Sequence, residues 1–198
     1  MPPFTVLHVC MGNICRSPMA ERLTVAAVRA LAGDKADELV LIHSTGTGGW
    51  HAGSRMDPSA ARQVLARGGE ADTFRARQLT TAHVEASDLV LTATTEQWEF
   101  VTGLAADAAA RTFVLGQFGR LLRRIDPAAL PPAAPTADAV YARGVALVSA
   151  VAEARGDRPP HLGDDLDDPW GRSDAYFGRV ADEVDGTVRP LAALLLGA

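Results

Sequence analysis

Residues 9–21 read Val-Cys-Met-Gly-Asn-Ile-Cys-Arg-Ser-Pro-Met-Ala-Glu. An apolar run at residues 4–9 precedes this stretch and predicts a buried strand, and residues 20–32 form a good helix sequence after it. The loop between them therefore ends at a helix N-terminus. Free backbone N–H groups and the helix dipole both favour a bound anion at such a position.

Cys10 and Arg16 stand six positions apart across this loop. Successive N–H groups of the loop can cradle phosphate oxygens, and the guanidinium of Arg16 can bind two of them as a fork. The same electric field favours a thiolate at Cys10, which would then be a nucleophile aimed at phosphorus. We therefore expect Cys10 to form a phosphocysteine that water hydrolyses, with Arg16 stabilising charge in the transition state.

The composition limits the classes of function. The 198 residues are 47% apolar and 22% charged, which predicts one soluble globular domain spanning residues 1–198. A net charge of −5 gives no electrostatic reason to expect binding to nucleic acid or to a membrane. The chain has only two cysteines, both in one loop, and five scattered histidines, so we expect neither a disulfide framework nor a metal. No signal peptide or membrane span is visible, which predicts a cytoplasmic protein. We also expect no cofactor.

The rest of the chain alternates between strands and helices. Continuous apolar runs predict buried parallel strands, and helical segments separate them. The expected fold is therefore α/β, a doubly wound four-stranded parallel sheet with helices on both faces and a ligand at the strand C-termini. The expected strands are residues 4–9, 39–44, 88–93 and 112–115; the expected helices are 17–31, 58–67, 95–105, 117–124, 137–154 and one from Ser173, which Pro190 should bend or break.

The sequence motif of the loop, Cys-x-Gly-Asn-x-Cys-Arg-Ser-Pro-x-Ala-Glu, resembles that of the low-molecular-weight protein tyrosine phosphatases. The resemblance implies hydrolysis of phosphotyrosine in a protein substrate, without a metal, and inhibition by phosphate-like oxyanions. Ser17 would donate a hydrogen bond to the Cys10 sulfur; it could also be a plain helix cap, and the two roles are compatible. The phosphate-binding residues that the resemblance implies are Met11, Gly12, Asn13, Ile14, Cys15 and Ser17.

A second resemblance lies at Asp165-Leu-Asp-Asp-Pro-Trp-Gly. Asp168, directly before Pro169, matches the family's general acid, whereas Asp165 and Asp167 are interpreted as surface or loop-shaping residues. Taken alone, Asp-Pro is only a turn signal. Asp168 must be protonated when the reaction begins while the thiol is ionised, so we expect a mildly acidic, bell-shaped activity profile.

The middle of the chain also resembles the family, at Ser44-Thr-Gly-Thr and Trp50-His. Ser44 can hydrogen-bond Asn13 and hold it in the left-handed conformation that such a loop often needs. Trp50 and Trp170 would wall the mouth of the pocket and fit a phenyl ring, and the alternative for each is ordinary core packing. The resemblance covers residues 4–92 and 165–185.

The chain departs from the family pattern at several places. Phe74 replaces the usual histidine, which removes one polar supporter of the loop, and residues 92–96 replace another family stretch. An extra loop and helix at about 126–160 would reshape the substrate rim or dock a partner. Cys15 either forms a reversible disulfide with Cys10 or is a small buried residue in a tight loop.

The sequence leaves two other functions open and disfavours two more. Arsenate reductases resemble this loop but need further cysteines, which the chain lacks. A phosphoarginine phosphatase remains an alternative, although family members with that preference tend to have threonine where Ile14 stands. A module that binds phosphate or phosphoproteins without turnover is the second alternative. No Gly-x4-Gly-Lys-Ser/Thr loop appears, which disfavours a nucleoside triphosphatase.

Overall fold

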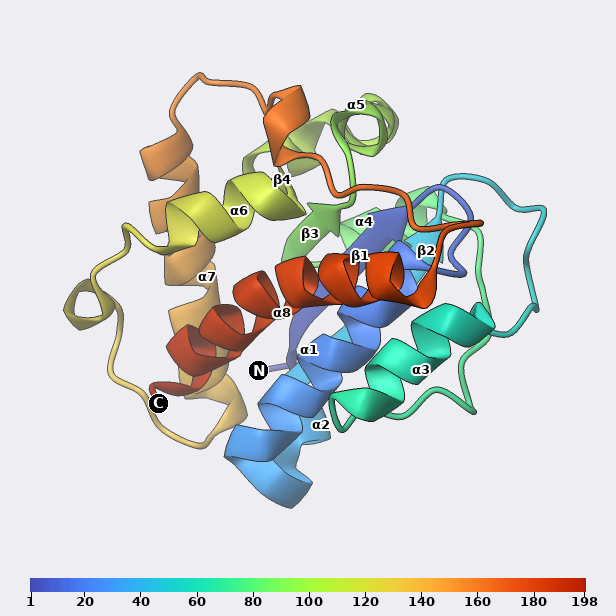
Figure 1. Cartoon of the computed structure of the whole chain (residues 1–198). Helices are drawn as coiled ribbons and strands as arrows, with labels where there is room; N and C mark the ends of the chain where they lie inside the picture. The colour runs from blue at the N-terminus through green and yellow to red at the C-terminus, as the bar shows by residue number, and fades with distance from the viewer.

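The centre of the protein is a four-stranded sheet, seen in a computed structural model that describes all 198 residues (Figure 1). Its strands are β1 (Phe4–Cys10), β2 (Val40–Gly46), β3 (Leu89–Thr92) and β4 (Thr112–Val114). They lie in the order β2-β1-β3-β4, and every pairing is parallel. The predicted α/β sheet is therefore confirmed, with β1 paired on both sides.

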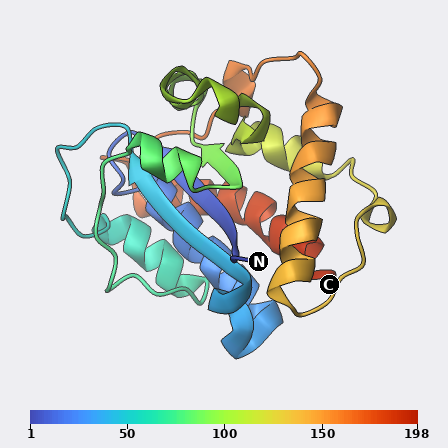
Figure 2. The ribbon, with the colours of Figure 1, turned by 180° about the vertical axis from the view of Figure 1, so that it is seen from behind.

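Helices cover both faces of the sheet, as Figures 1 and 2 show from opposite sides. On one face lie α1 (Arg16–Ala32), α3 (Pro58–Ala66) and α8 (Asp174–Leu196); on the other lie α4 (Thr81–Glu85) and α5 (Thr95–Leu104). The remaining helices are α2 (Ala36–Leu39), α6 (Leu115–Leu122), α7 (Ala137–Arg155) and the short 3-10 helices η1 (Gly33–Lys35), η2 (Ala106–Arg111), η3 (Pro127–Ala129) and η4 (Leu162–Asp164).

The core consists of two apolar clusters, one on each side of the sheet. Along β1, Phe4 and Val6 face the larger cluster, which includes buried residues of α1, α6, α7 and α8. Leu7 and Val9 face the smaller one, beneath α4 and α5. Side chains of a strand alternate between faces, so a strand covered on both sides must be apolar at nearly every position. This burial explains the continuous apolar runs in the sequence.

The segment from 126 to 160 contributes to the larger cluster. Its helix α7 buries Val140, Leu147 and Val151 there. Gly144 of the same helix lies against Phe4 of β1, because a Cβ at this glycine would come within 2.4 Å of the ring. The helix predicted at residues 137–154 is therefore present and packs directly on the first strand.

Two parts of the sequence-based assignment need correction. Pro190 does not break the last helix, since α8 runs continuously from Asp174 to Leu196. Leu191 and Leu195, beyond the proline, are fully buried, and their packing outweighs one missing backbone hydrogen bond. The short helices α2 and α4 were not predicted, because four or five residues carry no readable periodicity. No helix has the length and apolar character needed for a membrane crossing.

Candidate active site

The loop after β1 presents a set of free backbone donors. It connects Cys10, the last residue of β1, to the first turn of α1. Apart from the N–H of Asn13, its backbone donors point to no acceptor within the chain, so they are available to an anion at the positive end of the helix. These free N–H groups belong to Met11, Gly12, Ile14, Cys15 and Arg16.

The sulfur of Cys10 accepts two hydrogen bonds. The backbone N–H of Asn13 lies 3.3 Å from Sγ, and the hydroxyl of Ser17 lies 3.0 Å from it. The Ser17 hydroxyl also lies 3.2 Å from the carbonyl oxygen of Thr45. Cys15, not Ser17, occupies the N-cap position of α1, so the plain helix-cap interpretation of Ser17 is wrong. Two donors of the loop and of α1 therefore point at the Cys10 sulfur.

Asn13 holds the turn of the loop. Its φ of 53° is the one positive φ outside glycine, and asparagine tolerates this left-handed conformation better than most residues do. Its amide nitrogen donates to the hydroxyls of Ser17 and Ser44, each at 2.9 Å. Its amide oxygen accepts the backbone N–H of Arg77 at 2.7 Å. The predicted contact between Asn13 and Ser44 is therefore present.

A buried carboxyl group ends this network. Ser44 donates its hydroxyl to Glu21 at 2.6 Å, and burial is the main cause that raises the pKa of Glu21 above its usual value. Phe74, at the position of the expected histidine, is buried and lies beneath the guanidinium of Arg22 at 5.7 Å. Asn13 is nevertheless fully hydrogen-bonded without a histidine. Sequence reasoning missed Glu21, although it ends the quoted motif.

The end of β2 fixes the loop from the other side. Backbone N–H groups of Thr47 and Gly48 donate to the carbonyl oxygens of Cys10 and Met11, each at 2.9 Å. Only glycine fits at position 46, because a Cβ there would lie 2.6 Å from the Met11 carbonyl oxygen. The loop therefore has backbone as well as side-chain support.

Arg16 and Asp168 meet at the floor of the site. The guanidinium donates to the Asp168 carboxylate at 2.8 Å and to the carbonyl oxygen of Leu166 at 3.2 Å. The other carboxylate oxygen of Asp168 accepts the backbone N–H of Trp170 at 3.1 Å. The Arg16 side chain is buried while half of the Asp168 side chain is exposed, so the acid stands between the arginine and the solvent.

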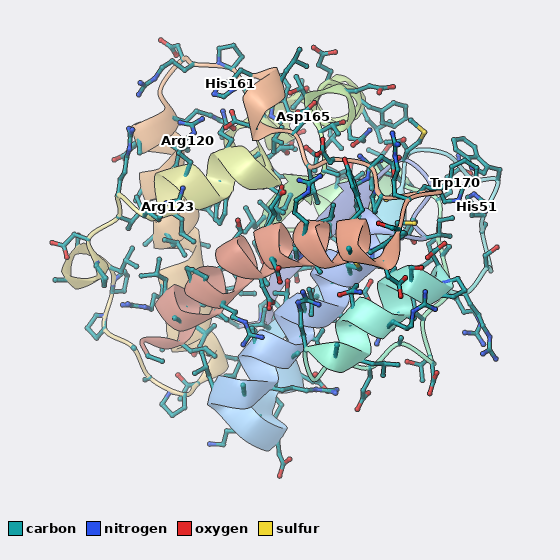
Figure 3. All side chains as sticks on the ribbon, viewed as in Figure 1. His51, Arg120, Arg123, His161, Asp165 and Trp170 are labelled. Carbon is teal, nitrogen blue, oxygen red and sulfur yellow. The ribbon has the colours of Figure 1, made fainter.

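A cavity of about 250 Å³ opens above these groups. Trp50 and Trp170 line it, and each is 67% exposed, which excludes core packing for both. His51 also lines the cavity, and Figure 3 shows it on the same side of the molecule as Trp170. Sequence reasoning did not single out His51, although it follows Trp50 in the quoted dipeptide. The predicted residues on the cavity wall are Cys10, Met11, Gly12, Ile14, Cys15, Arg16, Trp50, Asp168 and Trp170, whereas Asn13, Ser17 and Ser44 are buried outside this wall.

The second cysteine is a buried free thiol. Cys10 and Cys15 are both unpaired in this structure. Burial, with a smaller contribution from Asp57, raises the pKa of Cys15 well above its usual value. Cys15 is therefore a neutral thiol beside the proposed nucleophile. No group of three or more histidine, cysteine or acidic side chains is arranged to hold a metal ion.

Comparisons with known proteins give a family-model match and several relatives. The family model "Low molecular weight phosphotyrosine protein phosphatase" matches residues 5–128. The "Low molecular weight protein-tyrosine phosphatase A" of Mycobacterium tuberculosis is 38% identical over 126 residues, which cover 63% of this chain and 69% of that protein. The "Low molecular weight protein-tyrosine-phosphatase" of Streptomyces coelicolor is 39% identical over 126 residues, 63% of this chain and 71% of that protein.

Solved structures extend the likeness to the C-terminal part. The "YwlE arginine phosphatase from Geobacillus stearothermophilus" superposes with a TM-score of 0.64 at 25% identity, covering 96% of this chain and 91% of that one. The Wzb of Vibrio vulnificus, solved with benzylphosphonate, gives 0.64 at 21% identity and covers 96% and 97%. The family model stops before Asp168, so likeness around that residue is a likeness of fold.

Proposed function

The chain belongs to the low molecular weight phosphotyrosine protein phosphatase family, and on that basis we propose that it hydrolyses phosphotyrosine in proteins through a phosphocysteine at Cys10. The observation that carries the proposal is the convergence of four parts on one cavity. These are the Cys10 sulfur, the free N–H groups of the loop, the Arg16 guanidinium and the Asp168 carboxyl group.

In the first step, the Cys10 thiolate attacks phosphorus and the bond from phosphorus to the tyrosine oxygen breaks. Asp168, in its protonated form, gives its proton to that oxygen, so the leaving group departs as a neutral phenol. Arg16 and the loop N–H groups bind the three equatorial oxygens, which carry the charge in the transition state. The products of this step are tyrosine and a phosphocysteine.

In the second step, water attacks the phosphocysteine while the Asp168 carboxylate takes a proton from it. The sulfur leaves as a thiolate, and inorganic phosphate is released. The hydrogen bonds from Asn13 and Ser17 to the sulfur stabilise this leaving thiolate. The same residue therefore acts as an acid and then as a base.

The walls of the cavity favour an aromatic substrate. Trp50 and Trp170 present exposed indole rings to the cavity, and a phenyl ring gains contact area between such rings. Ile14, within the phosphate loop, adds an apolar branched side chain to the cavity wall. Phosphotyrosine carries its phosphate at the end of a flat ring and matches both features.

A phosphoarginine phosphatase is the second candidate. The observation that favours this candidate is the likeness to the YwlE arginine phosphatase, at 25% identity. Ile14 weighs against it, because an apolar side chain offers no acceptor to a charged guanidinium. A non-catalytic module that binds phosphoproteins is the third candidate, and it predicts binding without turnover.

The experiment that separates the proposed function from the binding module is hydrolysis of p-nitrophenyl phosphate and a phosphotyrosine peptide from pH 4.5 to 8, without added metal. We expect a mildly acidic bell-shaped profile, no activity in Cys10→Ser and a strong reduction in Asp168→Asn. Reduced, folded protein that binds phosphate but hydrolyses neither substrate would contradict the proposal and favour the binding module.

Three further expectations accompany the proposal. The whole chain, residues 1–198, works as one phosphatase domain, which the packing of α7 on β1 supports. A reactive thiol at Cys10 fits the reducing cytoplasm. Vanadate and phosphate should inhibit, since they would occupy the free loop donors in the same way as the substrate phosphate.

A further inference from the structure

The loop that leads to Asp168 is attached to the rest of the fold at successive residues. The backbone N–H of Leu166 donates to the carbonyl oxygen of Ala93 at 2.8 Å, just after β3. The Asp167 carboxylate accepts the Tyr176 hydroxyl at 3.0 Å and an Arg179 nitrogen at 2.6 Å, both from α8. These attachments come from two separate parts of the fold, the end of β3 and α8, so the path of the loop is strongly determined.

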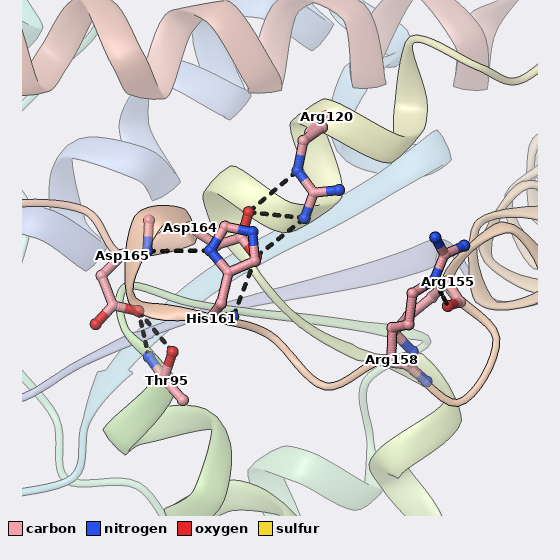
Figure 4. Close-up of polar contacts among 8 residues, drawn as sticks. Thr95, Arg120, Arg155, Arg158, His161, Asp164 and Asp165 are labelled. Carbon is pink, nitrogen blue, oxygen red and sulfur yellow. Dashed lines mark hydrogen bonds and ion pairs between the residues drawn. The ribbon is translucent and has the colours of Figure 1, made fainter.

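Asp164 begins this series of attachments. Its side chain is 3% exposed and accepts hydrogen bonds from the Arg120 guanidinium at 2.9 and 3.0 Å (Figure 4). The backbone of α6 also lies close to Asp164: a Cβ at Gly116 would be 2.4 Å from the Asp164 carbonyl oxygen. A buried carboxylate in a bidentate pair fixes position well.

Asp165 attaches the loop to the start of α5. One oxygen of its carboxylate accepts both the backbone N–H and the hydroxyl of Thr95, each at 2.7 Å (Figure 4). Thr95 is the first residue of α5 and lies 70 positions earlier in the chain. The preceding residue, Thr94, occupies the N-cap position but its side chain makes no capping hydrogen bond. Asp165 therefore supplies the cap of α5 from a distant loop.

A helix cap normally comes from the residue that precedes the helix. The cap from Asp165 comes from 70 positions away, so it stabilises α5 and also ties two distant segments of the chain together. It joins the C-terminal edge of the sheet to a point three residues before Asp168. Pro169 limits the backbone directly after the acid. A catalytic group must be held within about 0.5 Å of its working position, and support from neighbouring residues provides this precision.

We propose that Asp165 is a positioning residue for the reaction: by capping α5 through Thr95, it fixes the loop from which Asp168 delivers its proton. The inference rests on the proposed function, because it takes Asp168 as the general acid. The competing explanation is that Asp165 only stabilises the fold.

The two explanations differ in their dependence on the leaving group. Nitrophenolate leaves readily without a proton, whereas phenolate needs one, so a misplaced acid slows phenyl phosphate more than p-nitrophenyl phosphate. A loss of folded protein slows both equally. The ratio of the two kcat/KM values therefore reports the position of Asp168 and is independent of the amount of active enzyme.

The test compares this ratio in five proteins: the wild type, Asp168→Asn, Asp165→Ala, Asp165→Asn and Asp126→Ala. Asp126→Ala is the matched control, because Asp126 also caps a helix, η3, by accepting the Ala128 N–H at 2.9 Å, outside the loop. We expect Asp165→Ala to lose about tenfold more activity on phenyl phosphate than on p-nitrophenyl phosphate, less than the 10²–10⁴ that a positioned acid contributes, because the acid is displaced and not removed. Asp165→Asn keeps the acceptor and should restore most of the ratio, and Asp126→Ala should keep the wild-type ratio.

Each other result has a definite meaning. Equal losses on the two substrates in Asp165→Ala, or no loss, would overturn the inference. If that variant does not fold, Thr95→Val decides, because it removes only the hydroxyl donor; we expect a selective loss of about threefold, and an unchanged ratio would overturn the inference. An inactive wild type would instead contradict the proposed function, and a wild-type ratio in Asp168→Asn would contradict the assignment of the acid.

Discussion

The Arg16 guanidinium lies 2.8 Å from the Asp168 carboxylate, although the two residues are 152 positions apart in the chain. The arginine comes from the phosphate loop and the acid from the loop before α8. A substrate phosphate that binds the loop must share the arginine with this carboxylate or displace it. The pair therefore couples phosphate binding to the position of the proposed proton donor.

The first prediction concerns this competition. Asp168→Asn removes a negative charge that repels a phosphate ion and occupies Arg16, so inorganic phosphate should bind about tenfold more tightly, a gain of about 1.4 kcal/mol. Isothermal titration at neutral pH measures this affinity. Asp167→Asn is the control, because Asp167 pairs with Arg179 instead. Equal affinity in wild type and Asp168→Asn would show that Asp168 does not face the bound ion.

The second prediction concerns the network behind the loop. Ser44→Ala removes the acceptor of an Asn13 N–H and the hydroxyl that donates to Glu21. Two buried polar groups lose a partner, so the free energy of unfolding should fall by about 1–3 kcal/mol and kcat/KM should fall with it. Urea denaturation and steady-state kinetics measure the two effects. Ser54→Ala, at an exposed serine, is the control and should change neither; unchanged stability in Ser44→Ala would contradict a supporting role for the network.

The third prediction concerns a buried histidine in β1. The Thr24 hydroxyl donates to the Ala20 carbonyl oxygen at 2.6 Å, so the His8 ring must donate its Nε2–H to the Thr24 oxygen at 3.0 Å. Burial, with a smaller contribution from His43, lowers the pKa of His8 to about 3. The folded state thus keeps His8 neutral where the unfolded chain takes up a proton, near pH 6.5 and below.

Stability should consequently fall as the pH falls below about 6.5, because the unfolded state then binds more protons. His8 alone should contribute a loss of about 2 kcal/mol between pH 7 and pH 5. Urea denaturation of wild type and His8→Gln at the two pH values measures this contribution. The glutamine variant should show the smaller loss, and an equal pH dependence in both proteins would contradict the prediction.

The fourth prediction concerns the choice between phosphotyrosine and phosphoarginine. Ile14 lines the cavity and offers a guanidinium no hydrogen-bond acceptor. Wild type should therefore prefer a phosphotyrosine peptide over a phosphoarginine peptide by more than about tenfold, and Ile14→Thr should reduce that preference. Phosphate release from the two peptides measures it. Higher wild-type activity on phosphoarginine would favour the second candidate function.

Much of the fold was predictable because its signals are local. The four apolar runs became the four strands, and the helix after the phosphate loop follows from residues 16–32. The helix α6 begins at Leu115, two residues earlier than predicted, since it follows β4 without a loop. The continuity of α8 across Pro190 was not predictable, because it depends on burial of Leu191 and Leu195 in the core.

The candidate site also has a part that local sequence predicts and a part that it does not. The residues of the phosphate loop are consecutive, and their pattern predicts the loop conformation and the contact between Asn13 and Ser44. The cap that Asp165 provides to Thr95 joins segments 70 positions apart, and no local pattern encodes that pairing. From the sequence, Asp165 was interpreted as a surface or loop-shaping residue; the structure shows the helix to which it is attached.

The most direct test of the account is to capture the covalent intermediate. Wild type mixed with p-nitrophenyl phosphate should be quenched during turnover, digested and analysed by mass spectrometry. We expect one phosphoryl group on Cys10, retained in Cys15→Ser and absent in Cys10→Ser. Turnover that persists in Cys10→Ser, or a phosphoryl group carried by a different residue, would contradict the account.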